Sequence, residues 1–149
     1  MTPDVNVLVA AFRSDHVHHA TARGWLEDAR ADAAERGAGL VVLPMAAVGF
    51  VRLVTNRRVF PIPTPGRTAF AYLRALLETP GVTMVQLGAE WQRLSELSEE
   101  HGVVGGDISD AWIAASVLEQ HEHLVTFDRG FLDLLPRRNL TVLQPADSW

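Results

Sequence analysis

The sequence predicts one α/β domain in which a parallel sheet lies between two layers of helices. Short apolar runs rich in Val and Leu alternate along the 149 residues with longer helical segments, a pattern typical of parallel strands joined by helical crossovers. Apolar residues make up 48% of the chain, enough for a single core. We therefore expect one three-layer α/β/α domain over residues 1–149, with a central parallel sheet of four to five strands.

The expected elements follow in chain order. Val5 to Phe12 is apolar, and a run this short does not decide between a strand and a buried helix. Helices are expected at Ser14 to Arg36, Met45 to Thr55, Thr64 or Pro65 to Pro80, Ala89 to His101 and Ser109 to Gln120. Strands are expected at Leu40 to Leu43, Val82 to Leu87, Leu124 to Thr126 and Leu140 to Leu143. Helical spacing places Phe70 and Trp91 on core-facing stripes.

Two residue types are missing from the sequence, and each absence excludes a class of chemistry. Without cysteine there are no disulfides, thiolate nucleophiles or Cys-ligated zinc. Without lysine, all 13 positive side chains are Arg, which excludes the usual P-loop ATPase and disfavours receiver domains and haloacid-type phosphatases. The net charge of -5 argues against nonspecific binding of nucleic acid by the whole surface. The absence of a leader or a membrane-length apolar run predicts a cytoplasmic protein.

Four acids stand at element ends. Asp4 precedes the first apolar run, Asp107 and Asp110 begin an expected helix, and Asp128 follows the strand that ends at Thr126. Each has an ordinary structural explanation as a helix cap or turn residue. Together, however, acids at one edge of a parallel sheet form the oxygen-rich site that Mg²⁺ prefers. Such a site can activate water for attack on a phosphodiester.

Other polar residues point to weaker alternatives. His16, His18 and His19 do not have a recognised zinc-ligand spacing, and Ser109 and Ser116 lack an ordered His–Asp partner set for a hydrolytic triad. The tryptophans Trp25, Trp91 and Trp112 stand at helical spacing, which favours core or interface positions over base stacking. We expect contacts with RNA phosphates from Arg52, Arg57 and Arg58.

Three segments carry a resemblance to a known family: DVNVLVAA from Asp4, DAWIAASVLEQH from Asp110 and LVTFDRGF from Leu124. In this order and spacing, the chain resembles the PIN-domain ribonucleases, and specifically the VapC toxins of VapBC toxin–antitoxin pairs. The resemblance implies a helix for Val5 to Phe12 and an endoribonuclease that uses Mg²⁺ or Mn²⁺. It further implies a homodimer and a VapB-like antitoxin that inhibits it. Asp4, Asp110 and Asp128 match the family's acids, with Asn6 and Thr126 as companions that orient carboxylates or water.

The chain departs from the family pattern at one position. The family usually has a Glu on the helix after the second strand, where this sequence has Gly49 or Phe50, and no carboxylate occurs between Glu35 and Glu78. Asp107, one helical turn before Asp110, is our candidate replacement. The first strand is expected to be short, Met1 to Pro3, which leaves open a natural start further upstream.

We therefore predict a metal-dependent endoribonuclease toxin acting on tRNA, rRNA or mRNA, with Asp4, Asp107, Asp110 and Asp128 holding the metal. Two alternatives stay open. One is a catalytically weak PIN-like protein that binds RNA or a partner, because the expected Glu is missing. The other is a metal phosphohydrolase acting on small nucleotides.

Overall fold

The computed structural model describes residues 1–144, and its helices and strands alternate in the expected order; residues 145–149 of the expected domain lie outside the described part. The strands are β1 (Thr2–Pro3), β2 (Leu40–Val42), β3 (Val82–Met84), β4 (Leu124–Thr126) and β5 (Leu140–Val142). The α-helices are α1 (Val5–Phe12), α2 (His19–Arg36), α3 (Pro44–Val54), α4 (Gly66–Leu77), α5 (Trp91–His101) and α6 (Ile108–Glu119). The short 3-10 helices are η1 (Gly105–Asp107), η2 (Arg129–Asp133) and η3 (Arg137–Asn139).

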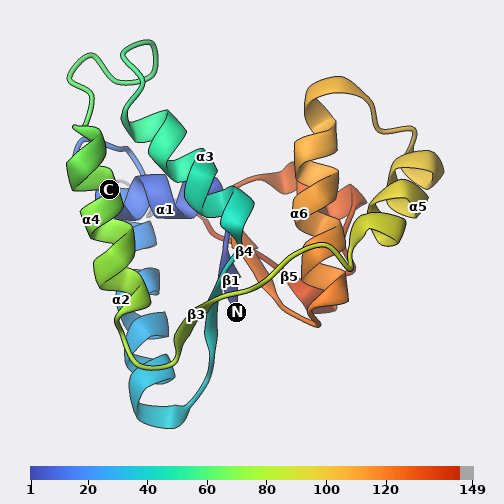
Figure 1. Cartoon of the computed structure of the whole chain (residues 1–149), viewed down its shortest axis with the longest axis horizontal. Helices are drawn as coiled ribbons and strands as arrows, with labels where there is room; N and C mark the ends of the chain where they lie inside the picture. Colours follow the sequence, from blue (N-terminus) through green and yellow to red (C-terminus); the bar gives the residue numbers. More distant parts are fainter. Residues whose placement is uncertain (145–149) are drawn as a thin grey trace.

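All strand pairs are parallel, as predicted. β1, β4 and β5 form a three-stranded sheet in the order β1-β4-β5, and β2 pairs with β3. The two sheets meet where the backbone N–H of Val41 donates to the Met1 carbonyl at 2.8 Å. In Figure 1 the strands run between α1 to α4 on one side and α5 and α6 on the other. The parallel α/β architecture is therefore confirmed, although the strands of residues 1–144 form a three-stranded and a two-stranded sheet instead of one sheet of four to five.

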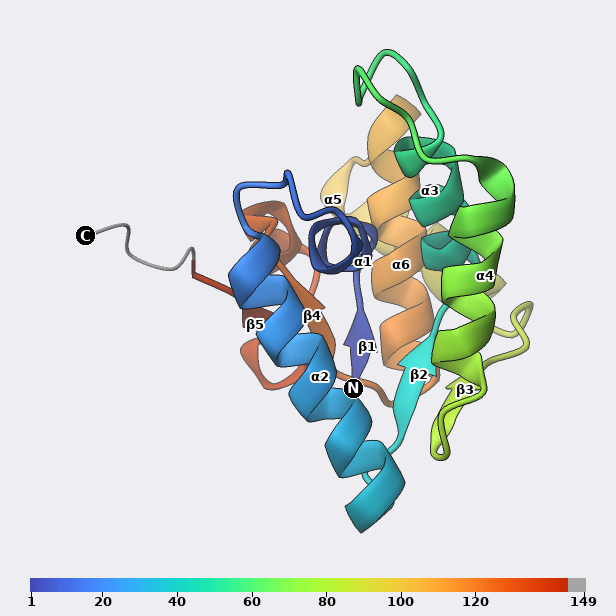
Figure 2. The same cartoon turned by 90° about the vertical axis from the view of Figure 1, so that its left-hand side faces the viewer.

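The segment that the sequence left undecided, Val5–Phe12, is the helix α1. Its residues Val7 to Ala11 are all buried. Five consecutive residues cover the whole circumference of a helix, so α1 is enclosed on every side and shows no amphipathic period. Only Asp4 separates β1 from α1, so the helix starts directly at the end of the strand. Figure 2 shows α1 end-on above β1.

Several expected details are wrong, for local reasons. Trp91 is 74% exposed and Phe70 57% exposed. In α4 the buried stripe runs through Ala69, Leu73 and Leu76, which puts Phe70 about 100° away from its centre. Trp91 is the first residue of α5 and its ring lines a surface groove.

Element boundaries also differ from the prediction by several residues. α2 begins at His19, because residues 14–18 form turns, and β3 ends at Met84 rather than Leu87. No helix within residues 1–144 combines the length and the apolarity needed to cross a membrane.

Candidate active site

Asp4 lies just beyond the end of β1, where the backbone directs it toward β4. Its N–H donates to the Val125 carbonyl at 2.9 Å, continuing the parallel pairing of the two strands. Its side chain is buried, with only 5% exposed. Oδ1 accepts from the Val5 N–H at 2.7 Å and caps α1, while Oδ2 accepts from the Thr126 hydroxyl at 2.6 Å. Asp4 is therefore both a helix cap and a polar group held at the sheet edge.

Thr126 connects the two ends of the chain through its hydroxyl group. While the hydroxyl donates to Asp4, its oxygen accepts from the Asn6 side-chain amide at 3.0 Å and from the Asp128 N–H at 2.9 Å. Asn6 in turn accepts from the Phe127 N–H at 3.2 Å. The network fixes the backbone just after β4, and so places Asp128 relative to Asp4. The predicted companions Asn6 and Thr126 thus contact the residues that they were expected to orient.

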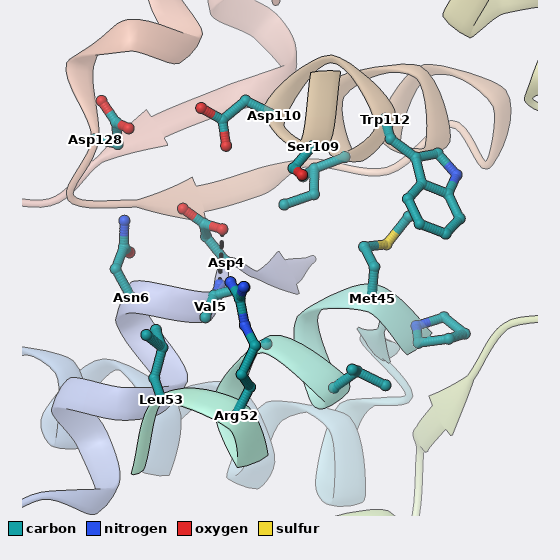
Figure 3. A pocket seen from close by; sticks show the side chains of 14 residues that line it. Asp4, Val5, Asn6, Met45, Arg52, Leu53, Ser109, Asp110, Trp112 and Asp128 are labelled. Carbon is teal, nitrogen blue, oxygen red and sulfur yellow. Dashed lines mark hydrogen bonds between the residues drawn. The ribbon is translucent and has the colours of Figure 1, made fainter. Parts of the chain in front are cut away.

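Two of the other three predicted acids, Asp110 and Asp128, come from α6 and from the turn after β4. Asp110 is half-buried in the first turn of α6. Asp128 precedes η2 and accepts from the Gly130 N–H at 2.7 Å. Asp4, Asp110 and Asp128 line one cleft of about 600 Å³, and Figure 3 shows their carboxylates on the same side of it. The structure therefore brings together three acids that lie far apart in the sequence.

The three carboxylates influence one another electrostatically. Burial, together with the negative charges of Asp110 and Asp128, raises the pKa of Asp4 from 3.8 to about 6, against the opposing hydrogen bonds from Thr126 and Val5. Burial and the charges of Asp128 and Asp107 likewise raise the pKa of Asp110. None of the ion pairs formed within residues 1–144 includes Asp4, Asp110 or Asp128. The cleft thus concentrates negative charge without a paired cationic side chain.

This donor set fits a hard divalent cation that keeps part of its water shell. In the described part of the chain, no three Asp, Glu or His side chains are close enough to enclose an ion by themselves. Mg²⁺ is commonly bound through one or two carboxylates, with water and substrate phosphate oxygens completing the octahedron. Neighbouring carboxylates that repel one another suit that arrangement, because a cation relieves the repulsion.

At the position where the family's Glu was expected, helices α1 and α3 pack closely against each other. Gly49 in α3 is buried, and a Cβ built on it would lie 2.8 Å from Cγ2 and 3.1 Å from Cγ1 of Val5 in α1. Gly49 and Val5 both line the acidic cleft. An apolar contact between α1 and α3 therefore takes the place of a carboxylate on this wall.

Asp107, the candidate replacement, faces a neighbouring hollow. It is exposed before α6, makes no side-chain capping hydrogen bond, and lines a hollow of about 740 Å³ with Asp110, Asp128 and Asp133. The cleft that contains Asp4 does not include Asp107 among its lining residues. A metal-binding role for Asp107 stays a prediction, and it requires an ion that lies between the acidic cleft and this hollow.

The arginines named as RNA contacts divide into two groups. Arg52, in the last turn of α3, lines the acidic cleft, and Figure 3 shows its side chain extending from α3 toward the side of Asp4. Arg57 and Arg58 are exposed in the turn after α3 and are not among the residues that line this cleft.

The histidines and serines considered for a zinc site or a hydrolytic triad make other contacts in the structure. The His18 ring stacks on Phe127 at 4.6 Å and the His19 ring nitrogen lies 2.8 Å from the Ala10 carbonyl, so these rings pack against the protein. Ser109 lines the cleft, but Ser116 is buried and donates to the Trp112 carbonyl at 2.8 Å.

Sequence reasoning missed Glu90, which holds Trp112. Glu90 is only 4% exposed; its carboxylate accepts from the Trp112 indole N–H at 2.7 Å and from the Gly88 N–H at 2.6 Å. Burial raises the pKa of Glu90, but the hydrogen bonds from Trp112 and Gly88 outweigh it and lower the pKa below its ordinary value. A Glu just before a helix is ordinary in a sequence, so nothing there signalled this contact. Trp112 itself is 38% exposed and lines the cleft.

Comparison with known proteins agrees with this architecture. The family model described as PIN domain matches residues 1–134. The chain is 40% identical over 129 residues to VapC ribonuclease Mb2897 of Mycobacterium bovis, an alignment covering 86% of this chain and 85% of the relative. It is 40% identical to ribonuclease VapC43 and 39% identical to ribonuclease VapC25 of Mycobacterium tuberculosis, over 86% of this chain and 85% and 88% of those proteins. The chain therefore belongs to the PIN-domain family and, within it, to the VapC ribonucleases.

Proposed function

We propose that this protein is an endoribonuclease toxin that depends on a divalent cation and cleaves RNA at the acidic cleft. The observation that carries the proposal is the convergence of Asp4, Asp110 and Asp128 on one cleft, in a chain whose relatives are ribonucleases. The raised pKa values of Asp4 and Asp110, caused by burial and neighbouring carboxylates, support a shared site for a cation.

Asp4, Asp110 and Asp128 would hold Mg²⁺ or Mn²⁺, with Asp107 assisting from the neighbouring hollow. When bound there, the cation would activate water for attack on phosphorus and neutralise charge on the phosphodiester. Asp4 loses its proton near pH 6 in the absence of a cation, so it is mostly a charged acceptor at neutral pH. Thr126 directs one oxygen of Asp4, and its hydrogen bond to the Asp128 N–H fixes the backbone that presents Asp128. Arg52, on the opposite wall, would meet an RNA phosphate.

The family membership also supports partners for the proposed toxin. A VapB-like antitoxin would cover the cleft and inhibit cleavage, and the toxin would form a homodimer in the cytoplasm. Candidate substrates are tRNA, rRNA and mRNA, with cleavage in loops whose bases are unpaired.

The direct test is cleavage of purified RNA by the isolated protein. We expect cleavage with Mg²⁺ or Mn²⁺, none with EDTA, and a loss of at least a hundredfold in Asp110→Asn. Asp28→Asn, which changes an exposed acid on α2, is the matched control and should cleave like the unmodified protein. Unchanged cleavage by a folded Asp110→Asn protein would reject the assigned site. Hydrolysis of nucleoside monophosphates without cleavage of RNA would instead favour a small-nucleotide phosphohydrolase.

One observation favours a second candidate, a protein that binds RNA with little cleavage. Gly49 leaves the α3 wall without a carboxylate, which lowers the number of available metal ligands. This candidate predicts RNA binding that is unaffected by EDTA and no cleavage at any Mg²⁺ or Mn²⁺ concentration.

A further inference from the structure

We propose that Trp112 is a stacking platform for an unpaired RNA base, and that Glu90 positions its ring. The inference rests on the proposed ribonuclease function, since it names the part of the RNA that the cleft would recognise. It also revises the expectation that Trp112 belongs to the core or to an interface.

The cleft has two chemically different ends. The acids Asp4, Asp110 and Asp128 occupy one end, and Trp112 and Met45 occupy the other, as Figure 3 shows. A further set of apolar side chains lines the same cleft: Pro44, Val48 and Ile113. A nucleotide has the same division, with an anionic phosphate that needs a cation and a base whose flat faces are apolar. A phosphate near the acids would therefore place a neighbouring base near Trp112.

Hydrogen bonding fixes the Trp112 ring before any ligand binds. The indole N–H donates to Glu90 Oε1 at 2.7 Å, and Glu90 Oε2 accepts from the Gly88 N–H at 2.6 Å. Because Glu90 is only 4% exposed, the carboxylate is a rigid anchor. The indole has a single N–H donor, and Glu90 already uses it. Recognition by Trp112 would then occur through the ring face, which tolerates different bases.

A second apolar groove adjoins the cleft, and its residues allow base stacking to be distinguished from the docking of a protein. Trp91, Leu94 and Ile108 line that groove of about 560 Å³, and Ser109 and Trp112 line both it and the cleft. Trp91 is 74% exposed but is absent from the lining of the acidic cleft. A protein partner seated in the groove would contact both Trp91 and Trp112. A base in the cleft, attached to a phosphate near the acids, would contact Trp112 alone.

The test is binding of a short, single-stranded oligoribonucleotide of mixed sequence, with Ca²⁺ in place of Mg²⁺ or Mn²⁺, monitored by the quenching of tryptophan fluorescence. Base stacking on an aromatic ring is worth about 1–3 kcal/mol, so Trp112→Ala should raise Kd roughly fivefold or more. Trp112→Phe, which keeps an aromatic face, should restore most of the affinity but lose the quenching. The matched control is Trp91→Phe, which should keep both affinity and quenching.

Glu90 is tested separately as a positioning residue. Glu90→Gln keeps an acceptor for the indole N–H but loses the acceptor for the Gly88 N–H, so it should weaken binding less than Glu90→Ala, which should also reduce the quenching. Placing an abasic nucleotide at successive positions of the oligoribonucleotide should lower affinity at one position, and this loss should disappear in Trp112→Ala.

Two results would overturn the proposal. The first is unchanged affinity and quenching in Trp112→Phe and unchanged affinity in Trp112→Ala. The second is an equal loss of RNA affinity in Trp112→Ala and Trp91→Ala. That result would show a contact spread over both the groove and the cleft, as expected for a partner larger than one base. Because binding is measured without Mg²⁺ or Mn²⁺, a failure to cleave RNA with Mn²⁺ would count against the ribonuclease function and not against the platform.

Discussion

The hydroxyl of Thr126 donates to Oδ2 of Asp4 at 2.6 Å, joining two residues that lie 122 positions apart in the sequence. The same hydroxyl oxygen accepts from the Asp128 N–H. One small side chain thus ties the acid after β1 to the acid after β4. This hydrogen bond, together with the parallel pairing of the two strands, brings the two ends of the chain into one site.

Replacing Thr126 by Val should destabilise the protein, and more strongly at high pH. The change keeps the side-chain shape, but it removes a donor to Asp4 and an acceptor for two N–H groups. Loss of a hydrogen bond to a charged group costs about 1.5–3 kcal/mol. Urea unfolding in EDTA should show this loss at pH 8 and a smaller one at pH 5, where Asp4 is largely protonated. Thr126→Ser should restore most of the stability; an equal loss at both pH values would contradict the role of the hydroxyl.

The metal-free protein should lose stability as pH rises from 4 to 7. Asp4 has a pKa of about 6 in the folded chain and 3.8 ordinarily. Between these values the folded state binds more protons than the unfolded state, so a rise in pH favours unfolding. The difference corresponds to about 3 kcal/mol at most. Urea unfolding across this range checks the slope, which Mn²⁺ should flatten because cation binding favours the ionised carboxylate. Stability that is flat or rising between pH 4 and 7 in EDTA would contradict the burial of Asp4.

Asp110→Asn should stabilise the protein in EDTA at pH 8. Burial and the charges of Asp128 and Asp107 already disfavour the ionised form of Asp110. Removing its charge relieves that repulsion, so we expect the Tm to rise. The exposed acid Asp28 on α2 provides the comparison, because Asp28→Asn should change Tm little. With saturating Mn²⁺ the order should reverse, since the unmodified protein gains binding energy that the variant lacks. A lower Tm for Asp110→Asn in EDTA would reject the repulsion between the acids.

Gly49→Ala should destabilise the protein, although alanine is the better helix former. The new Cβ would lie 2.8 Å from Val5 Cγ2, and overpacking of this kind costs about 1–3 kcal/mol. Gly24→Ala is a matched control in α2, because a Cβ at Gly24 meets nothing within 4 Å; it should stabilise by up to about 1 kcal/mol.

The cause of the Gly49 effect can be isolated by a double-mutant cycle with Val5→Ala. Removing the two γ-methyl groups should make Gly49→Ala much less costly, which gives a coupling free energy of about 1 kcal/mol or more. Strict additivity of the two substitutions would show that α1 and α3 do not meet at this contact.

The sequence was sufficient to predict the order of elements and to nominate the acids. Strands rich in Val and Leu alternate with helices, so the parallel topology follows from simple rules of chain connection. Asp4 and Asp128 could be placed at one sheet edge because parallel strands end on the same side. The helix α1 could not be recognised by period, because Val7 to Ala11 are all buried.

Tertiary contacts explain what the sequence could not predict. Trp91 stands at helical spacing from Leu94 and Leu97, yet only the two leucines are buried, because the first residue of α5 lies at a surface groove. Glu90 acquires its role only through Trp112, 22 residues later. Similarly, the sequence shows no carboxylate near Gly49, whereas the close approach of Gly49 to Val5 is seen only in three dimensions.

The most direct test of the account is the single-turnover rate of RNA cleavage by Asp4→Asn with Mn²⁺. Asp4 comes from the opposite end of the chain to Asp110 and Asp128, so its effect tests whether the three acids act as one site. We predict a fall of at least a hundredfold in a variant that far-UV circular dichroism shows to be folded. Cleavage by folded Asp4→Asn at the rate of the unmodified protein would contradict the account.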